Sequence, residues 1–104
     1  MDIRKGTIVG FRGSWGSGLG TLVLKDEKGV ETGVACENGA TVRALESAFG
    51  NVIGGSHNVE SKGGHVGQEI YYYMDEFGLC LGGFVPADEA TPELVEAYEA
   101  NITL

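Results

Sequence analysis

Glycine is the residue that most restricts how this chain can fold. There are 18 glycines among 104 residues, more than twice the roughly 7% of an average protein. They follow no three-residue period and are accompanied by two prolines, so neither a collagen-like repeat nor a proline-rich disordered chain fits. Glycines that separate short β-branched runs are typical of a small β-barrel or sandwich. The length predicts one domain over residues 1–104.

Alternating apolar residues predict five strands. The first, over 3–12, is expected to place Thr7, Val9 and Phe11 on one face and Ile8 on the other. The remaining strands are predicted over 19–25, 30–36, 68–74 and 79–85. The sequence DEKG between the second and third strands ends in a glycine that suits a tight hairpin loop.

Two segments have the spacing of helices instead. Within ENGATVRALESAFGN, Val42, Leu45 and Phe49 recur at helical intervals, and Gly50 marks the end. A second helix is predicted over 91–100, because Thr-Pro-Glu supplies a cap residue, a proline at the first helical position and an early acid.

The second helix is acidic but carries an apolar stripe, which predicts that it is docked rather than a disordered tail. The stripe consists of Val95, Tyr98 and Ile102. We expect these three side chains to pack against the strands while the acids face solvent or the basic N-terminal half.

The resulting order is three strands, a helix, two strands and a C-terminal helix. This order predicts a mainly β fold, a small five-stranded OB-like barrel with one helix between strands three and four. An SH3-like barrel is the alternative, because it is also a small five-stranded barrel. The 54–67 segment, which contains five glycines, is predicted to be a long loop.

The glycine-rich stretch GTIVGFRGSWGSGLG, residues 6–20, resembles the opening of cold-shock domains. The matching residues occur in order and without a gap: Gly6, Thr7, Phe11, Gly16 and Gly18. The resemblance implies the first corner of an OB-type barrel. Cold-shock domains stack bases on aromatic side chains, but those positions are Gly10, Ser17 and Leu19 here. The resemblance therefore implies the fold without the family's base-stacking surface.

Charge is distributed unevenly along the chain. Residues 63–104 contain eight acids and no lysine or arginine, so the whole net charge of −8 lies there. This acidity disfavours binding to nucleic acid or to an anionic membrane. We also find no run of about 18 apolar residues and no signal peptide at the N-terminus, and we expect a cytoplasmic protein with reduced thiols at Cys36 and Cys80.

These features favour a non-enzymatic module that binds another protein or itself. Its candidate contact residues are aromatic. Trp15 lies at the tip of the first corner. Tyr71 and Tyr73 share one strand face, which is either covered by the C-terminal helix or exposed as an adhesive patch.

The alternative is single-stranded nucleic-acid binding by the OB-like barrel. The residues that would carry it are Phe11, Arg12, Trp15, Lys25 and Arg43. The net charge and the lost stacking positions count against this hypothesis.

An enzyme or metal protein is the least favoured class. His57 and His65 share a glycine-rich segment with Glu60 between them, but their spacing matches no zinc signature. Cys36 and Cys80 lie in apolar runs and are expected to be inert. The sequence predicts no metal and no cofactor.

Overall fold

The protein is mainly β, with two α-helices. The computed structural model describes residues 2–13, 19–50, 52–53 and 62–102. The strands are β1 (Arg4–Gly13), β2 (Leu19–Lys25), β3 (Glu31–Glu37), β4 (Val52–Ile53), β5 (Lys62–Gly63), β6 (Glu69–Met74) and β7 (Leu81–Pro86). The helices are α1 (Asn38–Phe49), α2 (Pro92–Ile102) and the short 3-10 helix η1 (Ala87–Glu89). Neither α-helix has the length and apolar character that crossing a membrane requires.

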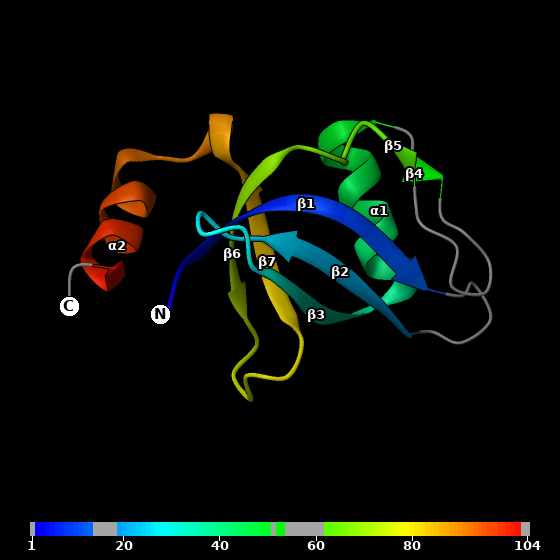
Figure 1. The fold of residues 1–104 in the computed structure, drawn as a ribbon, viewed down its shortest axis with the longest axis horizontal. Helices are drawn as coiled ribbons and strands as arrows, with labels where there is room; N and C mark the ends of the chain where they lie inside the picture. The colour runs from blue at the N-terminus through cyan, green and yellow to red at the C-terminus, as the bar shows by residue number, and fades with distance from the viewer. Residues whose placement is uncertain (1, 14–18, 51, 54–61, 103–104) are drawn as a thin grey trace.

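Five of the strands form one sheet in the order β3-β2-β1-β6-β7, and every neighbouring pair is antiparallel (Figure 1). β4 and β5 form a separate two-stranded sheet. An isolated parallel bridge joins Ala35 of β3 to Cys80, immediately before β7. The predicted order of three strands, a helix, two strands and a helix is confirmed for the long elements. Residues 54–61 of the predicted loop lie outside the described residues.

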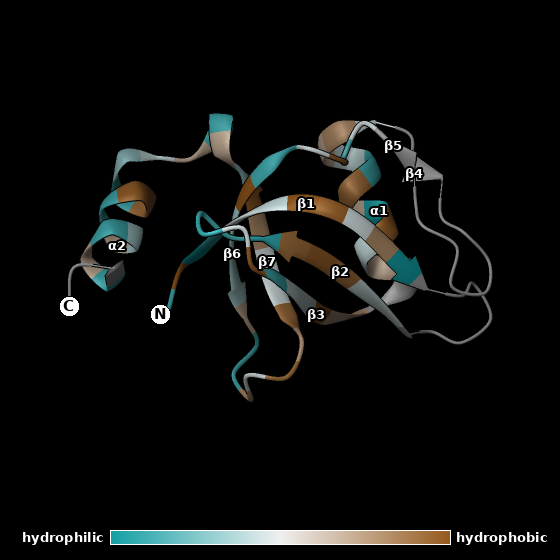
Figure 2. Ribbon diagram, in the orientation of Figure 1, coloured by the Kyte–Doolittle hydropathy of each residue, from teal (hydrophilic) through white to brown (hydrophobic). Residues whose placement is uncertain are grey.

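The core lies between the sheet and α1, which packs behind the sheet in Figure 1. Val42 and Leu45, two members of the predicted helical stripe, are buried, and Phe49 packs against them half-buried. Gly50 ends α1 as predicted, and its N–H donates to the carbonyl of Glu46 at 3.0 Å. Figure 2 shows apolar stretches of β1 and β2 beside the apolar part of α1.

A β-bulge in β1 corrects the predicted alternation of that strand. The register passes from Ile8 opposite Leu24 to Gly10 opposite Val23, so Val9 is an extra residue. A bulge of one residue resets the alternation of faces beyond it. Ile8 and Phe11 are therefore both buried, and Val9 is exposed. The prediction that Phe11 and Val9 share a face opposite Ile8 was wrong.

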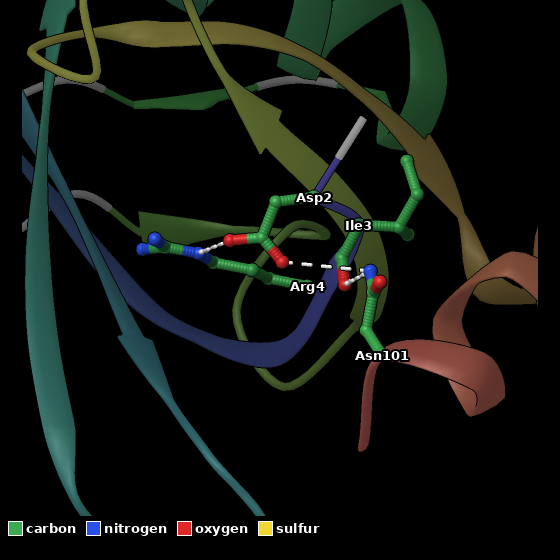
Figure 3. Close-up of polar contacts among 4 residues, drawn as sticks. All are labelled: Asp2, Ile3, Arg4 and Asn101. Carbon is green, nitrogen blue, oxygen red and sulfur yellow. Dashed lines mark hydrogen bonds and ion pairs between the residues drawn. The ribbon is translucent and has the colours of Figure 1, made fainter. Parts of the chain in front are cut away.

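α2 lies at one end of the molecule, beyond the start of β1 (Figure 1). The predicted cap is confirmed, since the Leu94 N–H donates to Thr91 Oγ1 at 3.2 Å. Asn101 Nδ2 donates to the carbonyl of Ile3 at 3.3 Å and to an Asp2 carboxylate oxygen at 3.4 Å (Figure 3). Asp2 also accepts a hydrogen bond from Arg4 Nε in the same group.

The predicted contact stripe of α2 is present in part. The Tyr98 ring packs against Tyr71, and Val95 is half-buried, whereas the Ile102 side chain lies outside the described part of the chain. No residue from 92 to 101 is fully buried. α2 is thus held by a few specific contacts rather than by a deep apolar interface.

Candidate interaction surface

The basic residues predicted to bind nucleic acid lie on different sides of the molecule. Arg12 and Lys25 are exposed on β1 and β2, at strand positions that alternate with the buried Phe11 and Leu24 and therefore face away from the core. Arg43 is exposed on α1, which packs against the core face. The structure does not bring these three cations together.

Phe11, one of the predicted aromatic contact residues, lies in the core. Phe11 is 1% exposed and belongs to the hydrophobic core, so its ring is not a surface for stacking a ligand. The bulge at Val9 is the reason, because it turns Phe11 inward. Trp15 lies outside the described residues.

The tyrosine pair on β6 is mostly covered. Tyr71 is buried, with its ring centroid 5.4 Å from that of Tyr98 on α2 in an edge-to-face arrangement. Lys5 Nζ lies 5.3 Å from the centroid of the Tyr71 ring. The first of the two expected alternatives, coverage by the C-terminal helix, therefore applies to Tyr71.

Tyr73 is half-buried beside a second bulge. Met74 pairs with Leu81 and Tyr73 with Gly83, which leaves Gly82 as the extra residue of β7. A Cβ at Gly83 would lie 2.7 Å from Tyr73 Oη, and one at Gly82 would lie 2.7 Å from Tyr73 Cε2. A larger residue at either position would force the Tyr73 ring to shift.

The histidine hypothesis gains no support from the described residues. His65 is fully buried, and burial lowers the pKa of its imidazole below the ordinary value. His57 and Glu60 lie outside the described residues. Within the parts of the chain that the structure describes, no three His, Cys, Asp or Glu side chains are grouped as a metal would require.

The two cysteines, 44 positions apart in the sequence, come to neighbouring places in the fold. Cys36 and Cys80 are both free thiols, and the bridge from Ala35 to Cys80 connects their strands. Burial raises the pKa of the Cys36 thiol, which disfavours its reactive thiolate form. Cys80, by contrast, is half-buried.

The turn between β6 and β7, residues 75–80, is the most apolar exposed turn that the structure describes. The Leu79 N–H donates to Asp75 Oδ1 at 3.0 Å, and the Gly78 N–H donates to the Asp75 carbonyl at 2.9 Å. The backbone N–H groups of this turn, Leu79 first, hold the pKa of the Asp75 carboxyl below its usual range. The turn is therefore ordered by its own backbone and by one carboxylate.

This 75–80 turn presents two large apolar side chains to solvent. Phe77 is 74% exposed and Leu79 is 69% exposed. Neither side chain takes part in the hydrogen bonds that order the turn, which come from backbone N–H groups and from Asp75. Single exposed apolar residues are common, but here two large ones lie two positions apart on one turn.

A groove of about 790 Å³ runs between α1 and β7, and the 75–80 turn lies at one end of it. On the α1 side its wall is made of small side chains, because Ala40, Ala44, Ser47 and Ala48 share one helix face. On the other side it is lined by β7 and by Cys80. We call this cavity the α1–β7 groove.

A second hollow of about 640 Å³ lies on the other side of the same turn. Arg4, Tyr73 and Phe77 line it, together with Asp2 and Met74. Asp75 borders both cavities. The 75–80 turn is thus bordered by two concave surfaces.

The charged residues that line the α1–β7 groove are all acidic. Asp75 lies at one end and Glu89 at the other. A smaller hollow of about 350 Å³ continues past Pro86 and adds Asp88. Arg43 is exposed on α1 but is not among the lining residues. The groove therefore presents an acidic field to a ligand.

Sequence reasoning missed this surface, although two signals pointed to it. The tetrads DEKG and DEFG begin two turns of the same design, and one carries phenylalanine where the other carries lysine. The alanines of the first helix also fall on one face, next to the apolar stripe that was predicted. No family model, curated protein sequence or solved structure matches this chain, so the surface is interpreted from its geometry alone.

Proposed function

We propose that this chain is a non-enzymatic protein-binding module whose contact surface combines the 75–80 turn with the α1–β7 groove. The observation that carries the proposal is the exposure of Phe77 and Leu79, at 74% and 69%, on the turn whose Asp75 and Cys80 line that groove. An aromatic anchor beside a concave apolar wall is the usual centre of a protein interface.

The proposal also concerns the fold that positions α1 and β7. We propose an OB-like barrel, supported by the sheet order, by α1 between β3 and β6, and by the parallel bridge from Ala35 to Cys80 between the two edge strands. An SH3-like barrel is the alternative. In either fold, α1 and β7 would form the walls of the groove.

Single-stranded nucleic acid is the second candidate ligand, favoured by the OB-like sheet order. Its expected platform is the outward face of β1, β2 and β3. Described side chains on that face include Arg12, Lys25, Val23 and Ala35, and none of the described ones is aromatic. Stacking on aromatic rings supplies much of the affinity of such platforms, so we rank protein binding first.

We also propose a cytoplasmic location. Cys36 and Cys80 are free, and the bridge between Ala35 and Cys80 brings them to neighbouring places. Neighbouring free thiols fit a reducing compartment, because an oxidising one favours disulfides.

The proposal is tested by capture on the immobilised chain from a lysate of its native host, followed by size-exclusion chromatography with light scattering. We expect the wild type to retain a stoichiometric protein partner or to self-associate, and Phe77→Lys to lose that species. Val30→Lys is the control, because Val30 is an apolar residue 55% exposed on the turn between β2 and β3, at the place that Leu79 occupies in the 75–80 turn. Equal capture by wild type and Phe77→Lys, or a strict monomer that retains no protein, would overturn the proposal.

A further inference from the structure

β7 is an edge strand whose second side faces the α1–β7 groove. In the described sheet β7 pairs with β6, and the bridge between Ala35 and Cys80 engages the chain just before β7 begins. An edge strand presents backbone N–H and C=O groups that another extended chain can pair with. The groove thus has a hydrogen-bonding wall as well as an apolar one.

The opposite wall leaves room for an added strand. The α1 residues that line the groove have small side chains, among them Ala44, Ser47 and Ala48. β7 spans six residues, so at about 3.3 Å per residue its edge is roughly 20 Å long. A partner segment of about six residues matches that length.

Charge identifies the kind of segment that fits. Asp75 lies at one end of the groove, and Glu89 and Asp88 lie at the other. Arg43 is the basic residue of α1, and it does not line the groove. A ligand with lysine or arginine at both ends and an uncharged middle is complementary to this pattern.

We propose that the α1–β7 groove binds an extended basic peptide segment of a partner protein, which adds as a further strand to the edge of β7 beyond its bridge to β3. Main-chain hydrogen bonds to β7 supply affinity, and the acidic ends select lysine or arginine at the ends of the segment. This inference rests on the proposed function, because it names the class of ligand for the same surface.

The test uses two pools of ten-residue peptides, each with six randomised central positions. One pool carries two lysines at each end and the other carries two glutamates. The lysine pool is expected to shift the amide signals of β7 and α1 and to slow amide exchange along β7. The glutamate pool is expected to bind at least about tenfold more weakly than the lysine pool. Added salt should weaken binding of the lysine pool.

A groove-filling variant and its control locate the effect. Ala44 is exposed and lines the groove, so Ala44→Trp is expected to fill it and to remove the β7 response. Ala97→Trp places the same side chain on an exposed alanine of α2, away from the groove, and should leave the response unchanged. The amide spectrum of each variant without peptide confirms that its fold is retained.

Several outcomes would overturn the inference. Equal binding of the two pools would show that the acidic residues do not select basic ends. Shifts confined to the outward face of β1–β3 would show that the peptide does not bind in the α1–β7 groove. Concentration-dependent shifts of β7 without any peptide response would identify a second copy of the chain as the occupant. If Ala44→Trp retains the captured lysate partner while Phe77→Lys loses it, the groove inference fails and the protein-binding proposal stands.

Discussion

Two hairpin turns of this protein share a backbone design and differ in the side chains that they expose. Residues 26–30 read DEKGV and residues 75–79 read DEFGL. In both turns the aspartate carbonyl accepts the glycine N–H, at 3.0 Å from Gly29 and 2.9 Å from Gly78. In both, the aspartate Oδ1 accepts the N–H of the residue after the glycine, at 2.9 Å and 3.0 Å.

The difference lies at the third position, Lys28 in one turn and Phe77 in the other. Figure 2 shows the turn between β2 and β3 as hydrophilic, whereas the turn between β6 and β7 runs into an apolar segment. The 26–30 turn demonstrates that the backbone arrangement forms with lysine at this place. The exposed Phe77 is therefore not needed to build its turn.

The two turns also differ in the parts of the molecule that surround them. Glu27 of the first turn accepts a hydrogen bond from Tyr98 Oη of α2 at 3.2 Å, so that turn serves to hold the helix. The second turn borders two cavities through Asp75. The first turn contacts α2, whereas the second exposes Phe77 and Leu79 to solvent.

The largest expected effect is a loss of partner binding when the exposed residues of the 75–80 turn are replaced by those of the 26–30 turn. A variant with Phe77→Lys and Leu79→Val should bind the captured partner about 30-fold more weakly, because an interface anchor is typically worth about 2 kcal/mol. Titration calorimetry measures this loss. The reciprocal variant, Lys28→Phe with Val30→Leu, should keep wild-type affinity, since α2 and not the α1–β7 groove adjoins that turn. A gain of affinity in the reciprocal variant would show that any exposed phenylalanine suffices.

The next effect concerns the glycines that both turns require. Gly29 has φ +82° and Gly78 has φ +69°, a left-handed conformation that costs other residues about 1–2 kcal/mol. Gly29→Ala and Gly78→Ala should each lower the free energy of unfolding by about that amount. Urea denaturation of the two variants checks this. A loss from Gly29→Ala with none from Gly78→Ala would contradict the shared backbone design.

A smaller effect is expected from the capping aspartates. Asp26→Ala and Asp75→Ala each remove an acceptor of backbone N–H groups, which should lower the melting temperature in thermal unfolding experiments. Asp→Asn at the same positions retains an acceptor oxygen and should recover most of the stability. If asparagine is as harmful as alanine at both positions, the hydrogen bonds are not the stabilising element.

The smallest effect is a dependence on pH at the 75–80 turn. Because the backbone N–H groups lower the pKa of Asp75 in the folded state, the folded protein binds this proton less readily than the unfolded chain. The stabilising contribution is therefore complete above the ordinary aspartate pKa of about 3.9 and is lost as the pH falls through the lower folded-state value. An NMR titration should show the Asp75 carboxyl titrating below the ordinary value, and the Leu79 amide signal should move with it. Titration at the ordinary value would contradict the contact.

Local features of the sequence predicted the elements well. The stripe of Val42 and Leu45, the stop at Gly50 and the Thr91 cap depend on neighbouring residues, so periodicity and capping rules find them. Tyr98 was likewise expected to dock α2 against the strands, and its ring packs on Tyr71.

Features that depend on tertiary pairing were not predictable in this way. The bulge at Val9 turns Phe11 inward through the register with β2, which no pattern within β1 reveals. The α1–β7 groove arises because the sheet order leaves β7 at an edge beside α1. The exposure of Phe77 could have been suspected from the repeated tetrad, but its place beside the groove required the fold.

The location of the bound partner tests the central claim most directly. Hydrogen–deuterium exchange of the free protein and of its complex with the captured partner compares the two turns within one experiment. We predict slower exchange over residues 75–86 in the complex and unchanged exchange over residues 26–30. Protection of the outward face of β1–β3 or of the 26–30 turn, with no change over residues 75–86, would contradict the account.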